Sequence, residues 1–164
     1  MGMYTEFVMA AKLKKDTPKT VIDILEFMVR DREDPPIDLL DHPLFQTERW
    51  RIMLCCDSAY FAGDTHSMLS KREYDFGVEY TLTIRCNLKN YDSEIEWFLD
   101  WISPYIDSTY DGFIGYMLYE EYDDPTLIYF DTYDRKCPIQ LVEGILDGDV
   151  CRKRSLSEVL GKEN

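Results

Sequence analysis

Lysine and arginine are absent from a long stretch of the sequence, between Asn90 and Asp134. These 45 residues contain 12 carboxylates, which account for most of the formal net charge of −14, and they also contain 13 of the 23 aromatic residues. A surface that is selected only for solubility intersperses lysines among its acids, because alternation removes the repulsion between like charges. The absence of cations therefore marks this stretch as the feature that a function has to explain.

Further absences exclude whole classes of protein. No apolar run approaches the roughly 18 residues of a membrane-spanning helix, and no signal-peptide pattern is found. The five cysteines are odd in number and none stands in a Cys-x-x-Cys pair, which favours free thiols in a reduced compartment, and hence a cytoplasmic protein, over a disulfide scaffold. The eight glycines are scattered and form no phosphate-binding loop.

The length of 164 residues and the hydrophobic content of 45% predict one folded domain. We expect this domain to cover residues 1–150. Residues 151–164 carry a net charge of +2, opposite in sign to the rest of the chain, and we expect them to form a basic, disordered tail. The sequence pI near 4.4 argues against direct binding to nucleic acid or to anionic membranes, because both repel an acidic protein.

Alternation of apolar and polar residues predicts five strands, and helical spacing predicts two helices. The clearest pattern covers Val78–Lys89, where six apolar side chains in succession fall on one face. The other strands are expected at 3–14, 49–56, 112–119 and 126–131. One helix is expected to begin at Thr17-Pro18, and the other to begin with the capping box Ser93–Glu96 and end at Ser103-Pro104. Residues 31–48 are expected to be an irregular connection, and residues 139–150 a short closing element.

An internal similarity indicates the fold class. The strand at 3–14 and the helix after it resemble the strand at 78–89 and its helix. A further strand after each pair gives the order β-α-β-β-α-β, with one extra strand at the C-terminal end. We therefore predict an α+β protein with a ferredoxin-like split βαβ sandwich, in which two helices lie on one face of an antiparallel sheet. Such a fold carries many unrelated functions and predicts none of them.

The two histidines supply an alternative site. His42 lies near two aspartates, and His66 follows Asp64, all in predicted loops. If the loops met, His42, Asp64 and His66 would line a pocket able to bind a metal or a small ligand. A catalytic pair formed by Cys55 and His66 is a further alternative, in which the cysteine would act as a nucleophile. Neither spacing is specific, so surface or capping histidines are the preferred interpretation, and we expect no catalytic residue, metal or cofactor.

Within the acidic stretch, Asp92, Glu96 and Asp100 recur every four residues and should line one ridge of a helix, about 6 Å apart along its axis. This spacing approximates that of successive phosphates along a nucleic-acid strand. Trp97 and Trp101 are expected at the edge of the apolar stripe of the same helix, where aromatic rings can anchor a partner. The predicted binding residues are these five and the turn residues Glu120, Glu121, Asp123 and Asp124.

These features favour a small acidic protein of the cytosol whose acidic and aromatic face binds a basic protein surface. An inhibitor or immunity-type protein that imitates nucleic acid would have such a face. One alternative is an enzyme or ligand-binding domain that uses His42, Asp64 and His66. Another is a homodimer, or a larger homo-oligomer, joined through exposed Trp97 and Trp101. The simplest interpretation is a solvated acidic face, with the tryptophans covered by residues 31–48. The binding hypothesis would fail if cations from elsewhere in the chain neutralised the carboxylates.

Overall fold

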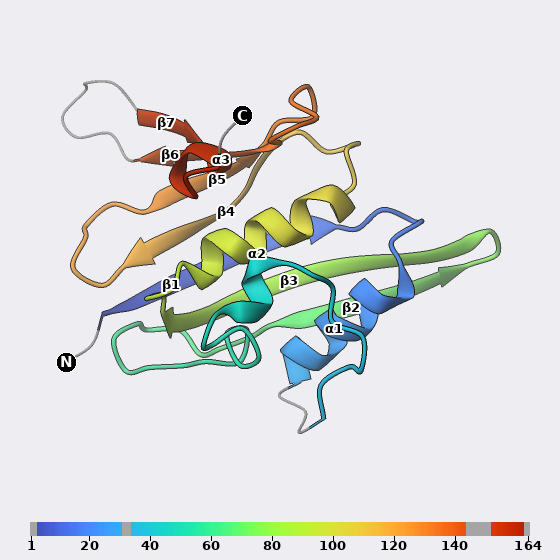
Figure 1. Ribbon diagram of the computed structural model, residues 1–164, viewed down its shortest axis with the longest axis horizontal. Helices are drawn as coiled ribbons and strands as arrows, with labels where there is room; N and C mark the ends of the chain where they lie inside the picture. The colour runs from blue at the N-terminus through green and yellow to red at the C-terminus, as the bar shows by residue number, and fades with distance from the viewer. Residues whose placement is uncertain (1–2, 31–33, 144–151, 163–164) are drawn as a thin grey trace.

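A seven-stranded antiparallel sheet forms the centre of the molecule (Figure 1). The computed structural model describes residues 3–30, 34–143 and 152–162. The helices are α1 (Lys19–Arg30), α2 (Glu94–Ile102) and α3 (Leu156–Val159), and two short 3-10 helices are η1 (Pro43–Gln46) and η2 (Ser103–Tyr105). The strands lie in the order β2-β3-β1-β4-β5-β6-β7, with the bounds β1 (Tyr4–Lys12), β2 (Met68–Tyr74), β3 (Gly77–Lys89), β4 (Gly112–Tyr119), β5 (Thr126–Phe130), β6 (Ile139–Glu143) and β7 (Arg152–Ser155). The predicted α+β class is confirmed.

The two long central strands follow the predicted alternation. β1 pairs with β3 along its whole length and with β4 on its other side. Phe7 lies opposite Cys86 and Met9 lies opposite Ile84, and all four side chains are almost completely buried. Because successive side chains of a strand point to opposite faces, this register places the apolar residues of both strands in one layer.

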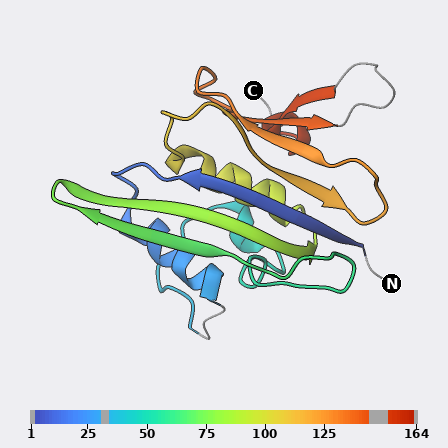
Figure 2. The ribbon, with the colours of Figure 1, turned by 180° about the vertical axis from the view of Figure 1, so that it is seen from behind.

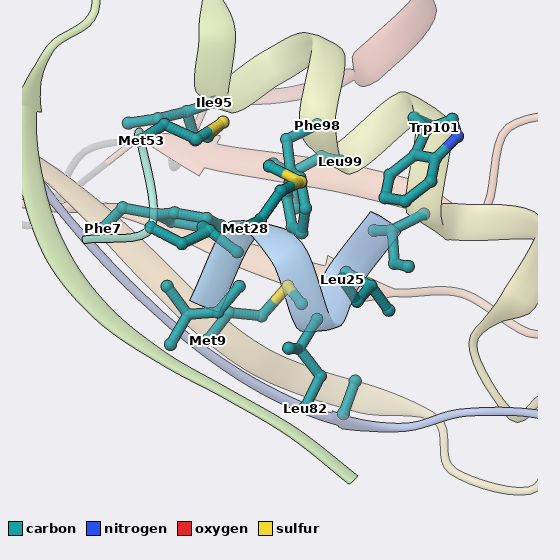
Figure 3. Packing of buried hydrophobic residues seen from close by; sticks show 14 of the residues in the cluster. Phe7, Met9, Leu25, Met28, Met53, Leu82, Ile95, Phe98, Leu99 and Trp101 are labelled. Atoms are coloured by element: carbon teal, nitrogen blue, oxygen red, sulfur yellow. The ribbon is translucent and has the colours of Figure 1, made fainter. Parts of the chain in front are cut away.

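α1 and α2 cover the same face of the sheet, and the core lies between them and the strands (Figures 1 and 3). α1 contributes Leu25 and Met28, and α2 contributes Phe98 and Leu99, all fully buried. Phe98 packs edge-on against Phe7, with ring centroids 6.0 Å apart. Burial of one such side chain contributes about 1.5–3 kcal/mol relative to exposure, so the apolar stripe of α2 anchors this helix. In the described ranges no helix combines the length and the apolar character that crossing a membrane requires.

The opposite face of the sheet is covered by no helix of the described residues (Figure 2). A row of apolar side chains crosses it from β1 to β6. Its members are cross-strand neighbours and are each partly exposed: Val8, Tyr116, Leu127 and Val142. This face is open only in part, because Glu6 and Asn87, which lie opposite each other on it, are 6% and 2% exposed.

Both edge strands of the sheet carry cations. β2 forms one edge and contains Lys71 and Arg72, which are exposed. β7 forms the other edge and contains Arg152, Lys153 and Arg154, of which the last is partly buried. Charged side chains on an edge strand discourage its pairing with another sheet.

The second strand lies elsewhere than the sequence predicted. Residues 49–56 form turns, and β2 lies at Met68–Tyr74. Within the turns Met53 and Leu54 are buried whereas Ile52 is 45% exposed, so the apolar residues there do not alternate between two faces. β2 consists mostly of exposed and charged residues and is held by its pairing with β3, which gives a weak sequence signal.

From β1 to β4 the strands and the α-helices follow one another in the predicted order β-α-β-β-α-β. The order of the whole sheet is not ferredoxin-like, because β5, β6 and β7 continue it beyond β4. The finer prediction, a ferredoxin-like split βαβ sandwich with one extra strand, is therefore not confirmed.

The described part of the C-terminal segment belongs to the fold, in contrast to the expected disordered tail. β7 pairs with β6, and Leu156, the first residue of α3, is 1% exposed and joins the main core. The hydroxyl of Ser155 caps α3 by accepting a hydrogen bond from the backbone N–H of Glu158 at 3.3 Å. The basic composition hides this order, which comes from backbone pairing with β6, from the burial of Leu156 and from the ion pair of Lys162 with Asp100.

Candidate functional site

The start of α2 is fixed by Asn90, not by the predicted capping box. Ser93 has φ 58° and its side chain makes no capping hydrogen bond. Instead, Oδ1 of Asn90 accepts a hydrogen bond from the backbone N–H of Ile95 at 2.9 Å, and Nδ2 of Asn90 donates one to Oε2 of Glu96 at 2.8 Å. Asn90 thus satisfies an N–H of the first turn and sets the direction of the Glu96 carboxylate.

The three carboxylates of the predicted ridge have different surroundings. Asp92 is exposed, and its Oδ2 accepts a hydrogen bond from the backbone N–H of Glu48 at 3.3 Å. The side chain of Asp100 is only 18% exposed and pairs with both His42 and Lys162. Glu96 faces a cavity that is described below. The three therefore form no continuous exposed row, and a spacing like that of phosphates is not presented to a partner.

His42 and Lys162 hold Asp100 in its ionised form. Nδ1 of His42 accepts a hydrogen bond from the backbone N–H of Leu44 at 3.1 Å, so a neutral His42 carries its proton on Nε2, which lies 2.8 Å from Oδ2 of Asp100. Burial acts to raise the pKa of Asp100, but the hydrogen bonds from His42 and Lys162 outweigh it, and the pKa lies below its ordinary value. The cluster fastens η1 and the C-terminal segment to α2.

The tryptophans of α2 do not form an exposed pair. Trp101 is 3% exposed, and its ring packs edge-on against Phe45 of η1 at a centroid distance of 5.5 Å. Trp97 is partly exposed, with His42 edge-on at 6.0 Å and Nζ of Lys162 at 5.4 Å from its ring centroid. Trp101 is thus a core residue and does not lie at the predicted edge of the apolar stripe, and the two rings form no exposed pair.

The turn between β4 and β5, residues Glu120–Asp124, contains three of the exposed acids of the stretch and is termed the acidic turn. Glu121, Asp123 and Asp124 are exposed, and among the described residues no ion pair joins them to a lysine or arginine. Oε1 of Glu120 accepts a hydrogen bond from the backbone N–H of Met3 at 2.5 Å. This bond ties the acidic turn to the start of β1.

A cavity of about 280 Å³ lies beside the acidic turn, lined by the start of α2, by β1, by β4 to β7 and by α3, and it is termed the edge cavity. Both ribbon views show the acidic turn, the N-terminal end of β1 and the start of α2 at the same side of the molecule (Figures 1 and 2). Three carboxylates and three tyrosines contribute to its lining: Glu96, Asp124, Glu143, Tyr91, Tyr119 and Tyr122. The fold thus brings together two predicted site residues from separate elements, Glu96 and Asp124.

Glu96 forms part of the cavity wall. Burial raises the pKa of Glu96, and the hydrogen bond from Asn90 offsets this effect only in part. A carboxyl group whose pKa is raised by desolvation and which lines a cavity is an indicator of a functional site.

Another part of the lining contains a cation that is already paired. Arg154 of β7 forms an ion pair with Glu143 of β6, and both line the edge cavity. Nε of Arg154 is buried and has no hydrogen-bond partner within the described ranges. Because Glu143 balances Arg154, the remaining carboxylates, Glu96 and Asp124, give the lining a net negative charge.

The edge cavity has an apolar floor and an aromatic rim. Met117 and Leu141 are buried residues of the sheet that contribute to its lining. Tyr91 and Tyr122 are 51% and 67% exposed, and Tyr119 contacts Tyr122 edge-on with ring centroids 5.2 Å apart. Such a lining favours an elongated group with an apolar stem and a positive head.

The residues predicted for a loop pocket contact different elements. His42 contacts α2, whereas the backbone of His66 exchanges hydrogen bonds of 2.7 and 3.1 Å with Arg85 of β3, and Asp64 is exposed. In the part of the chain that the structure describes, no group of three or more histidine, cysteine, aspartate or glutamate side chains is placed to hold a metal ion.

The sequence analysis missed Asn90, Glu143 and Arg154. Asn90 precedes a helix and could have been recognised as a residue whose side chain bonds to backbone groups of the first turn. Glu143 and Arg154 gave no signal, because they lie in short strands and meet only through the pairing of β6 with β7.

No protein-family model matches the chain, and no curated protein or solved structure matches it at a significant level. The function therefore has to be argued from the acidic turn and the edge cavity.

Proposed function

We propose that this protein acts by binding, and that the acidic turn and the edge cavity together engage a basic surface on another protein. The supporting observation is the grouping of Glu96, Asp123 and Asp124 at one side of the molecule without ion pairs to lysine or arginine among the described residues. A partner can supply the cations that this side lacks.

The overall charge supports the same partner. With a formal net charge of −14, the chain attracts a basic protein over distances longer than a contact, which accelerates association. Exposed charges are screened within about 10 Å at an ionic strength of 0.1 M. Association should therefore slow markedly as salt is added.

The exposed rings at the rim supply contact area that charge alone does not. Tyr91, Tyr122 and Asp124 all line the edge cavity, and both tyrosines are exposed. Tyrosine is enriched among the residues that dominate binding energy at protein interfaces. The rim thus combines aromatic anchors with carboxylates.

An inhibitory role against a nucleic-acid-binding protein is one use of such a surface, since these proteins carry basic grooves. The spacing of Asp92, Glu96 and Asp100 does not support it, because His42 and Lys162 occupy Asp100. The support comes from the net charge and from the acidic turn.

The experiment compares three versions of the protein as baits in a cell extract: the wild type, Asp123→Lys/Asp124→Lys, and the control Asp16→Lys/Asp75→Lys. Both variants exchange two exposed aspartates, so the change in net charge is the same. Asp16 belongs to the connection from β1 to α1, and Asp75 belongs to the turn between β2 and β3. Both of these segments lie at the side of the molecule opposite the acidic turn (Figure 1). Captured proteins are identified, and their dissociation constants are measured against NaCl concentration.

The proposal expects a basic partner that the wild type and the control retain and that the acidic-turn variant loses. Its dissociation constant should rise steeply with salt. Equal capture by all three baits, or equal loss from both variants, would contradict a specific role for this side of the molecule.

A narrower topological assignment is proposed here as well. The portion from β1 to β4 has its strands in the order β2-β3-β1-β4 with α1 and α2 on one face, which supports a ferredoxin-like unit extended by β5, β6 and β7. A fold assignment of this kind adds nothing to the functional proposal.

A further inference from the structure

We infer that the edge cavity receives a single alkylammonium or alkylguanidinium group, supplied either by a lysine or arginine side chain of the basic partner or by a free amine. This inference rests on the proposed function, and it names the chemical group that the site recognises.

The size of the cavity favours one side-chain-sized group over a larger ligand. Its volume is about 280 Å³. Sites for drug-sized molecules span about 300–1,000 Å³, so this cavity lies just below that range. A chain of a few methylene groups with one charged head is of suitable size.

The floor suits an apolar stem. Met117 and Leu141 are 9% and 4% exposed and contribute to the lining from β4 and β6, with Val159 of α3 nearby in the same lining. Lysine and arginine bury their methylene stems along apolar surfaces while the charged head remains near polar groups. A stem against Met117 and Leu141 would place the head near the carboxylates of the wall.

The charges in the lining favour a cation over an anion. Arg154 is engaged by Glu143, so an anionic head would meet two carboxylates, Glu96 and Asp124, without a free cation in the described lining. A cationic head would find the same two carboxylates as partners. Tyr119 and Tyr122 add ring faces, which attract ammonium and guanidinium groups through their quadrupoles.

The position of Glu96 adds a proton linkage. Burial raises the pKa of this carboxyl group, whereas a bound cation favours the ionised form and therefore lowers the pKa. Cation binding must then release protons in the pH interval between these two values. Affinity for the cation should increase with pH through that interval and become constant above it.

The test uses small probes of matched length at constant ionic strength: n-butylammonium, N-butylguanidinium and the neutral n-butanol. Binding is followed by chemical-shift changes of backbone amides that line the edge cavity, including those of Asn90, Thr126 and Leu141. Both cations should produce saturable changes at these amides, and n-butanol should bind at least about tenfold more weakly, since hydrogen bonds to charged groups are worth roughly 1.5–3 kcal/mol.

Two variants locate the cation. Glu96→Gln should weaken both cations by roughly tenfold or more and should abolish the pH dependence, and Asp124→Asn should weaken them without abolishing it. The control Asp75→Asn removes one negative charge from an exposed residue in the turn between β2 and β3, and should bind the cations within about twofold of the wild type.

Two further probes distinguish the sources of the group. Tighter binding of spermidine than of Nα-acetyl-lysine amide indicates a free polyamine. Displacement of the captured basic protein by Nα-acetyl-lysine amide, without tighter binding of spermidine, indicates a side chain of that partner. The inference is overturned if no cation saturates the cavity amides, if n-butanol binds equally well, or if Glu96→Gln behaves as Asp75→Asn does. A partner that is lost with Asp123→Lys/Asp124→Lys but not with Glu96→Gln would remove this inference and leave the proposed function standing.

Discussion

Replacement of Leu156 by alanine tests whether the C-terminal segment is part of the folded unit. Leu156 is 1% exposed and belongs to the main core, although it stands in a segment that is basic and short. If the segment were disordered, Leu156→Ala would leave the stability unchanged. In the structure the substitution removes three carbon atoms from a packed site.

The expected loss follows from this burial. Leucine-to-alanine substitutions in cores cost about 2–5 kcal/mol, as a transfer term plus a term for the cavity left behind. α3 has four residues and lies at the margin of the core, so it can shift to fill part of that cavity. We therefore expect the lower part of the range, about 2–3 kcal/mol, which corresponds to a fall in Tm of about 4–12 °C for a chain of this size.

Urea denaturation followed by tryptophan fluorescence measures this free energy, because Trp97 contacts Lys162 of the same segment. The control is Leu39→Ala, since Leu39 is 41% exposed and its truncation should change the free energy of unfolding by less than about 0.5 kcal/mol. If Leu156→Ala and Leu39→Ala unfold at the same urea concentration, the assignment of the C-terminal segment to the core is wrong.

Three other outcomes follow from single contacts. Asp100→Asn should lower the free energy of unfolding by about 1.5–3 kcal/mol at pH 7, measured by urea titration. Because the pKa of Asp100 is depressed in the folded state, the wild type and the variant should differ fully in stability above roughly pH 5. This difference in stability should shrink as the pH falls below about 4, which urea titration at each pH measures. Glu96→Gln should be at least as stable as the wild type at pH 7. Because the pKa of Glu96 is raised in the folded state, the wild type loses stability as the pH rises through that pKa, and the glutamine variant does not. The free energies of unfolding of the two proteins, measured as a function of pH, should converge toward pH 4. Gly115→Ala should destabilise by at least about 2 kcal/mol, since a Cβ there would lie 2.0 Å from the carbonyl oxygen of Val8 on the neighbouring strand; a stability equal to the wild type would show that the two strands are not so close.

The alternation of apolar and polar residues predicted those strands whose apolar side chains lie on one buried face. β3 was predicted almost to the residue, because its apolar face is continuous and buried from Leu82 to Leu88. The α+β class followed from the two strand–helix pairs. β2 escaped prediction since an edge strand needs no apolar face, and Arg49–Cys56 was assigned wrongly since its apolar residues pack as turns.

The candidate site was predicted in part. The acidic turn is exposed as its composition indicates, and Glu96 and Asp124 do line one cavity. The predicted exposed row of carboxylates along α2 was wrong, because His42 and Lys162 pair with Asp100. Helical spacing cannot reveal these contacts, since both residues are far from Asp100 in the sequence. Sequence separation hides such contacts whenever they form between elements rather than within one.

The lysines and arginines of β2 and β7 affect whether the edge strands of two copies can pair. A sheet extends from one molecule to the next when the edge strand of one copy pairs its free N–H and C=O groups with the edge strand of another. Here β2 would bring Arg72, and β7 would bring Arg152 and Lys153, toward the edge of the second copy, where the same cations lie. An acidic chain thus places several of its 18 lysines and arginines where strand addition between copies would begin. Repulsion between these charges is least screened in dilute salt, so low ionic strength opposes such growth most strongly.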